Sequence, residues 1–152
     1  MADTDLMQLY SRRILALASD IPHLGKLAEP TGSAHRRSPQ CGSSVTAHVV
    51  VRDGKVADFS QEVRACALGQ ASASVLGATV LGRSRDEIAK ATAELTAMLK
   101  SDGPPPTAPF DGLEALLPAR EFPNRHASIL LAWQAVLDAM DSSAESATNQ
   151  PA

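Results

Sequence analysis

A β-hairpin signature in the middle of the chain is the feature that most limits the folds open to it. Residues 45–51 are rich in β-branched side chains, Asp53-Gly54 is typical of a two-residue turn, and residues 55–63 supply the return strand. An antiparallel hairpin brings the chain back to its starting edge. The residues just before and just after it are therefore expected to lie close together.

Both cysteines of the chain flank this hairpin. Cys41 precedes it, next to Gly42, and Cys66 follows it, directly before a run of small residues that predicts a helix. A cysteine that opens a helix lies at the positive end of the helix dipole, and Arg64 adds a nearby cation, so we expect Cys66 to favour the thiolate. We predict that both sulfur atoms converge at one exposed end of the domain. The alternative interpretation is a pair of small, buried, inert thiols.

Periodicity, glycine and proline define the elements around the hairpin. Apolar residues recur at helical spacing over residues 5–17, with Asp3 or Thr4 as the expected cap, whereas residues 21–40 indicate an irregular segment with a short strand near Leu27. After Cys66 we expect a helix to about Leu81. Three later helices are expected. The first follows a capping box at residues 84–87, the second covers residues 111–117, and the third starts near residue 124 with Trp133 on its apolar face.

Length and composition predict one globular domain over residues 1–140. A chain of 152 residues suits one core, and 44% hydrophobic with 20% charged residues excludes a disordered protein. Residues 141–152 are small and polar, which predicts a disordered tail. The net charge of -3 gives no general attraction to nucleic acid or to an anionic membrane. The polar residues within the apolar run 65–82 argue against a membrane span.

The N-terminal residues are acidic and lack the features of a secretion signal, so we expect a cytoplasmic location. Reducing conditions there keep thiols free, which makes Cys41 and Cys66 better candidates for reactive groups or ligands than for a permanent disulfide.

With this order of elements, the chain resembles the U-type iron-sulfur cluster assembly scaffold family, which includes NifU N-terminal-like and SufU-like proteins, and most closely its SufU-like branch. The resemblance extends over residues 6–138. The second cysteine block is the most specific part of it. The matching segments are Leu9-Tyr10, Ile14-Leu15, Pro39-Gln40-Cys41-Gly42, Asp53-Gly54-Lys55-Val56, Cys66-Ala67, Gln70-Ala71-Ser72-Ala73-Ser74, and Arg125 spaced before Leu131-Ala132-Trp133.

The resemblance implies an α+β fold, in which a small antiparallel three-stranded sheet packs with four to five helices. It also implies one exposed site built from three cysteines and an aspartate. Cys41 and Cys66 retain two of these groups, whereas Ser43 and Ser128 stand at the positions of the aspartate and the third cysteine. A serine hydroxyl stays protonated near neutral pH and is a poor ligand for zinc or iron. The resemblance therefore predicts a depleted metal site.

His126 is the candidate replacement ligand. It lies two positions before Ser128, which rotates it by about 200 degrees on a helix, so a shifted helix start would be needed. The alternative for His126 is a solvated surface residue. The candidate metal ligands are thus Cys41, Cys66 and His126, for zinc, iron or a transient iron-sulfur cluster.

The resemblance implies a carrier or scaffold protein of iron-sulfur cluster assembly, and not an enzyme. Its expected partners are a cysteine desulfurase, which would deliver persulfide sulfur to Cys66 and Cys41, and iron-sulfur acceptor proteins. Arg125 is a candidate partner contact. A homodimer is one way to restore four thiolates around a cluster, because each copy would supply two cysteines.

Two other function classes stay open. Ser43 and Ser128 favour a metal-free regulatory or interaction module derived from the same family. A small thiol enzyme with Cys66 as its nucleophile is the other alternative, although the chain has no C-x-x-C motif.

Overall fold

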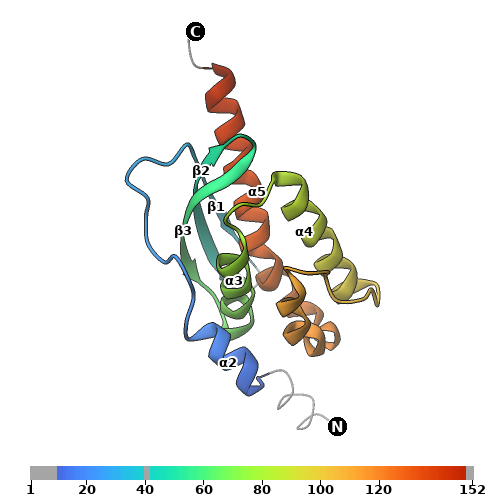
Figure 1. Cartoon of the computed structure of the whole chain (residues 1–152). Coiled ribbons are helices and arrows are strands. Elements are labelled where there is room, and N and C mark those ends of the chain that lie inside the picture. The colour runs from blue at the N-terminus through green and yellow to red at the C-terminus, as the bar shows by residue number, and fades with distance from the viewer. Residues whose placement is uncertain (1–9, 40–41, 150–152) are drawn as a thin grey trace.

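The structure, a computed structural model, describes residues 10–39 and 42–149 (Figure 1). Among these residues, one helix precedes three consecutive strands, and only helices follow them. The elements are α2 (Arg12–Ala18), β1 (Gly32–Arg37), β2 (Ser44–Arg52), β3 (Lys55–Arg64), α3 (Ala67–Thr79), α4 (Arg85–Lys100), the 3-10 helices η1 (Asp111–Glu121) and η2 (Pro123–Arg125), and α5 (His126–Asn149).

The three strands form one antiparallel sheet in the order β1-β2-β3, which confirms the predicted α+β class. The hairpin joins β2 to β3 through Asp53 and Gly54, whose φ angles are 53° and 75°. Two successive positive φ angles are what a tight hairpin turn of the predicted kind requires. At the opposite end of the sheet, Ser44 pairs with both Arg37 and Arg64. That end carries the residues on either side of the hairpin.

The first strand differs from the prediction. We expected a short strand near Leu27, but the strand is β1, at Gly32–Arg37. Its sequence is poor in β-branched residues, so local propensity does not mark it. Tertiary contacts hold it instead, because β1 pairs with β2 and its Gly32 lies against the Ala139 backbone of α5. A Cβ atom at position 32 would collide with the Ala139 carbonyl oxygen.

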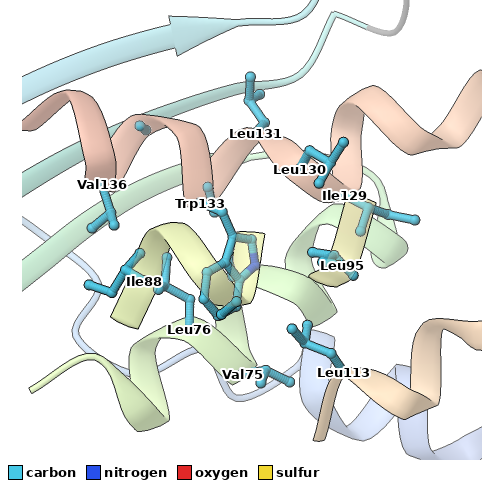
Figure 2. Close-up of a cluster of buried hydrophobic side chains, with 14 of the residues drawn as sticks. Val75, Leu76, Ile88, Leu95, Leu113, Ile129, Leu130, Leu131, Trp133 and Val136 are labelled. Carbon is cyan, nitrogen blue, oxygen red and sulfur yellow. The ribbon is translucent and has the colours of Figure 1, made fainter. Parts of the chain in front are cut away.

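Helix α5 packs along β1 and β2, while α3 and α4 pack against α5 (Figure 1). The core lies between these layers. Figure 2 shows Trp133 of α5 surrounded by side chains of α3, α4 and η1, among them Leu76, Ile88, Leu95 and Leu113. This arrangement confirms that the last helix presents Trp133 to the core.

Most of the predicted helix boundaries are confirmed. The capping box forms as expected, because the Glu87 N–H donates to Ser84 Oγ at 3.2 Å and the Ser84 N–H donates to Glu87 Oε1 at 3.1 Å. The helix expected over residues 111–117 is a 3-10 helix that continues to Glu121. Within the described residues, the helix expected over residues 5–17 begins only at Arg12, because Ser11 caps α2; the expected caps Asp3 and Thr4 lie outside that part of the chain.

The prediction of a disordered tail from residue 141 is wrong over residues 141–149, because α5 continues through Asn149. Two polar contacts attach this part of the helix to the domain. Arg85 Nε donates to Asp141 Oδ1 at 2.6 Å, and the Thr31 and Ser143 hydroxyls lie 2.7 Å apart. Among the described helices, none combines the length and the apolar character needed to cross a bilayer.

Candidate functional site

Cys66 lies at the junction between the hairpin and the core helix, as predicted. It is the N-cap residue of α3, with backbone angles of φ -66° and ψ 171°, and its side chain makes no capping hydrogen bond. The side chain is half-buried, and Sγ lies 3.6 Å from the Ser128 hydroxyl oxygen. The sulfur is therefore held at the start of a helix and in contact with a second helix.

Ser43 and Ser128 meet directly beside this cysteine. Ser43 immediately precedes β2, Ser128 lies in the first turn of α5, and their hydroxyl oxygens are 3.0 Å apart. Both serines are buried, each with an exposed fraction of 2%. We call Ser43, Cys66 and Ser128 the site corner. It joins the sheet, α3 and α5 at one point, although these residues are far apart in sequence.

Cys41 lies outside the described residues, so the convergence of its sulfur with that of Cys66 stays a prediction. The backbone on either side is described. The Ser38 N–H donates to the Ser43 carbonyl oxygen at 2.8 Å, and the Gly42 N–H donates to the Ser38 carbonyl oxygen at 2.9 Å. Gly42 has a φ of 70°, which favours glycine. The segment between β1 and β2 is therefore closed by backbone hydrogen bonds next to the site corner.

Gly69 explains part of the small-residue run that follows Cys66. A Cβ atom at this position would lie 2.6 Å from Ser128 Oγ and 2.8 Å from the Ala65 Cβ. One turn further along α3, the Ser72 hydroxyl donates to the Ile129 carbonyl oxygen at 2.6 Å. Small residues let the two helix backbones approach closely, and this approach brings Ser128 to Cys66. The resemblance identified the block after Cys66 as its most specific part, and the close packing of α3 against α5 is the physical reason.

His126 occupies a structural position in this conformation. Its side chain is 5% exposed, so the alternative of a solvated surface histidine is wrong. Nε2 lies 2.9 Å from the Ala119 carbonyl oxygen, and because a carbonyl only accepts, this nitrogen carries the proton. Helix α5 begins at His126 itself. To bind a metal through Nε2, the imidazole would first have to give up its contact with η1.

The site corner is a poor fit for a four-ligand metal centre. One thiol and two hydroxyl groups meet there, and neutral hydroxyls neither replace thiolates nor balance the charge of the cation. Across residues 10–39 and 42–149, no group of three or more His, Cys, Asp or Glu side chains is arranged to hold a metal ion. Cys41 lies outside the described residues, so the depletion expected from Ser43 and Ser128 stays a prediction.

Arginines surround the site end of the sheet. Arg37 and Arg64 are exposed on the strand ends that pair with Ser44, while Arg36 Nε donates to Asp138 Oδ2 of α5 at 2.6 Å. Arg125 lies in η2, and within the described part of the chain its guanidinium has no ion-pair partner.

A groove of about 360 Å³ runs beside the site corner, and its walls include Arg36, Arg37, Pro39, Ala127 and Leu131.

Comparison with known sequences identifies relatives that match most of the chain. Residues 9–111 match the NifU-like N terminal domain. The chain is 27% identical over 137 residues to the iron-sulfur cluster assembly scaffold protein IscU of Thermotoga maritima, covering 87% of this chain and 92% of the relative. It is 26% identical over 144 residues to IscU of Streptococcus pyogenes serotype M1, covering 95% and 90%.

Solved structures share the fold. The crystal structure of a nitrogen-fixing NifU-like protein (N-terminal) from Brucella abortus matches with a TM-score of 0.90 and 42% identity, covering 93% of this chain and 98% of that one. A putative iron-sulfur cluster assembly scaffold protein for the SUF system from Fervidobacterium islandicum matches with a TM-score of 0.78 and 20% identity, covering 88% and 98%. At that identity the second match bears on the fold alone.

Proposed function

Because the chain belongs to the family of NifU-like N terminal domains, we propose that it is a scaffold or sulfur carrier protein of iron-sulfur cluster assembly, of the SufU-like type. The observation that carries this proposal is the site corner, where Cys66 opens α3 in contact with Ser128 of α5. A thiol at a helix start is suited to hold a sulfur atom that develops negative charge. Free thiols of this kind persist in a reducing compartment, which suits a cytoplasmic location.

We propose that sulfur arrives from the persulfide of a cysteine desulfurase. The thiolate of Cys66 attacks the outer sulfur of that persulfide, the new sulfur-sulfur bond forms on Cys66, and the desulfurase cysteine leaves as a thiolate. The exchange is balanced without an external oxidant. Cys41 is the second proposed acceptor, and Arg125 is a proposed contact for the partner because its guanidinium is not paired within the described residues.

The iron-sulfur cluster is cargo in this proposal. One copy offers the thiolates of Cys41 and Cys66, with His126 as a third candidate, either through Nδ1 while Nε2 donates to the Ala119 carbonyl oxygen or through Nε2 once that bond breaks. A homodimer would bring four cysteines together, which is the thiolate number of a typical two-iron cluster. We therefore propose transient assembly between two copies, followed by delivery to acceptor proteins, with no catalytic turnover by the chain itself.

Anaerobic reconstitution tests this function. The purified chain is incubated with a cysteine desulfurase, cysteine and ferrous iron, and bound iron, acid-labile sulfide and the visible absorption spectrum are measured. We expect stoichiometric sulfur and iron in the natural chain. Cys66→Ser should lose the iron and keep only the sulfur that Cys41 accepts, whereas Ser33→Ala, at an exposed position at the other end of β1, should retain both. A chain that acquires neither sulfur nor iron would contradict the proposal.

The second candidate, a metal-free regulatory or interaction module, is favoured by the hydrogen bond between Ser43 and Ser128. It predicts that the chain changes the rate of a cysteine desulfurase without itself carrying sulfur. In the same experiment, Cys66→Ser would then leave that effect on the desulfurase intact.

A further inference from the structure

In the site corner, three polar side chains contact one another in a row. They lie where the ligands of a metal would otherwise hold the elements together. Ser43 Oγ is 3.0 Å from Ser128 Oγ, which in turn is 3.6 Å from Cys66 Sγ. Ser128 is thus the middle member, and it contacts both a strand entry and a helix start. These contacts connect the start of β2, the start of α3 and the start of α5, which are the elements that a metal would connect.

We propose that Ser128 is a positioning residue for the Cys66 sulfur, and that its hydrogen bond with Ser43 holds the site corner closed without a metal ion. This inference rests on the proposed acceptance of sulfur by Cys66. It assigns to this chain a metal-free way of presenting that sulfur. Ser128 thereby has a role of its own, and does not merely mark a lost ligand.

The hydrogen-bonding capacity of a hydroxyl group supports this role. A serine hydroxyl donates one hydrogen bond and accepts two, so Ser128 can accept from Ser43 while it donates to an anionic sulfur on Cys66. Hydrogen bonds to charged acceptors are roughly twice as strong as neutral ones. Because Ser128 is 2% exposed, water competes little for its proton. The half-buried sulfur can still be reached by a partner.

Packing fixes the hydroxyl in this place. Gly69 leaves room for Ser128 Oγ on the side of α3, since a Cβ atom at position 69 would be 2.6 Å away from it. The adjacent bond from Ser72 to the Ile129 carbonyl oxygen fixes the next residue of α5 against the same helix. The distance from Ser128 to Cys66 is therefore set by helix packing, which needs no bound ion.

In the transfer step, the Cys66 thiolate bonds to the outer sulfur of a donor persulfide, and the donor's inner sulfur leaves as a thiolate. Cys66 then carries the persulfide, whose charge stays beside the helix start and the Ser128 hydroxyl. No electrons are gained or lost overall, because one sulfur-sulfur bond replaces another. No metal takes part in this step.

The test uses the full chain with Cys41→Ser, so that mass spectrometry reports sulfur on Cys66 alone. Glutathione persulfide serves as the probe, in anaerobic buffer with a strong chelator. We expect transfer in the parent protein, unchanged by the chelator, and a roughly tenfold slower transfer in Ser128→Ala, as the loss of one hydrogen bond to a charged group predicts.

Ser43→Ala is the matched variant. Both alanine variants lose the hydrogen bond between the two serines, so we expect similar decreases in thermal midpoint. Only Ser128→Ala also loses the contact with Cys66. We therefore expect a smaller loss of transfer rate in Ser43→Ala, within about threefold of the parent. Similar thermal midpoints with different transfer rates in the two variants would show that Ser128 positions the sulfur and is not only structural.

Equal loss of rate in the two variants would overturn the positioning role of Ser128 while leaving sulfur acceptance intact. Transfer that stops in chelator and returns with added zinc would overturn the metal-free part. A parent protein that accepts no sulfur from glutathione persulfide or from a cysteine desulfurase would overturn the proposed function, and this inference with it.

Discussion

Helices α3 and α5 are joined by hydroxyl groups at two places, and the two contacts differ in what surrounds them. In the core, the Ser72 hydroxyl accepts from the Trp133 indole N–H at 3.0 Å and donates to the Ile129 carbonyl oxygen. In the site corner, the Ser128 hydroxyl lies between Ser43 and Cys66. The first contact is enclosed by apolar side chains, whereas the second ends on a half-buried thiol. The Ser72 hydroxyl therefore stabilises the fold, whereas the Ser128 hydroxyl faces a reactive group.

The largest effect should come from breaking the core contact. Trp133 is fully buried and also forms an edge-on contact with Phe110, with ring centroids 5.6 Å apart. We expect Trp133→Ala to lower the free energy of unfolding by about 3–5 kcal/mol, because it leaves a cavity and removes one of the two hydrogen bonds of Ser72. Urea unfolding followed by circular dichroism measures this. Leu24→Ala, at a 59% exposed position, should change it by less than about 0.5 kcal/mol.

A smaller effect should follow from Gly69→Ala, which adds a methyl group between the two helices at the site corner. The Cβ atom would be 2.6 Å from Ser128 Oγ, so α3 and α5 must separate, at a cost of about 1–3 kcal/mol of unfolding free energy. Gly112→Ala is the control, because its Cβ would meet only Val75 at 3.5 Å. Equal stabilities of the two variants would show that the close approach of the helices is not needed.

Restoring the family's ligand types should convert the site corner from a hydrogen-bonded site into a metal site. We expect the Ser43→Asp, Ser128→Cys double variant to bind zinc or ferrous iron at least about tenfold more tightly than the natural chain, since it gains two anionic ligands. Competition with a chromophoric chelator measures the affinity. If both proteins bind tightly, another ligand must take part, and His126→Ala then tests whether His126 is that ligand.

The smallest expected effect concerns the two thiols. Cys66 lies half-buried at the start of α3, so a limiting alkylating reagent at neutral pH should modify it before Cys41, by a factor of a few, because the free N–H groups of the helix start stabilise negative charge that develops on the sulfur. Peptide mass mapping gives the order of labelling. Preferential labelling of Cys41 would mean that the segment between β1 and β2 carries the more reactive thiol.

Local sequence patterns were sufficient where short-range chemistry decides the structure. The hairpin turn and the Ser84 capping box depend on residues within a few positions of each other, and both were predicted. Strand β1 was misplaced because its stability comes from β2 and from the contact of Gly32 with Ala139.

The end of α5 and the site corner depend on contacts between distant residues. A polar segment after residue 140 resembles a tail, yet Asp141 is held by Arg85 and Ser143 by Thr31. The positions of Ser43 and Ser128 were inferred from the resemblance, but their direct hydrogen bond could not be. Nor could the burial of His126, because its partner is a backbone carbonyl oxygen seven residues away.

The exposed charges of β1 bear on how two copies of the chain can associate. β1 is an edge strand, and three of its residues, His35, Arg36 and Arg37, are exposed basic or titratable side chains. Charged residues on a sheet edge oppose the addition of another strand. Extension of the sheet from one copy into the next is thus disfavoured along this edge.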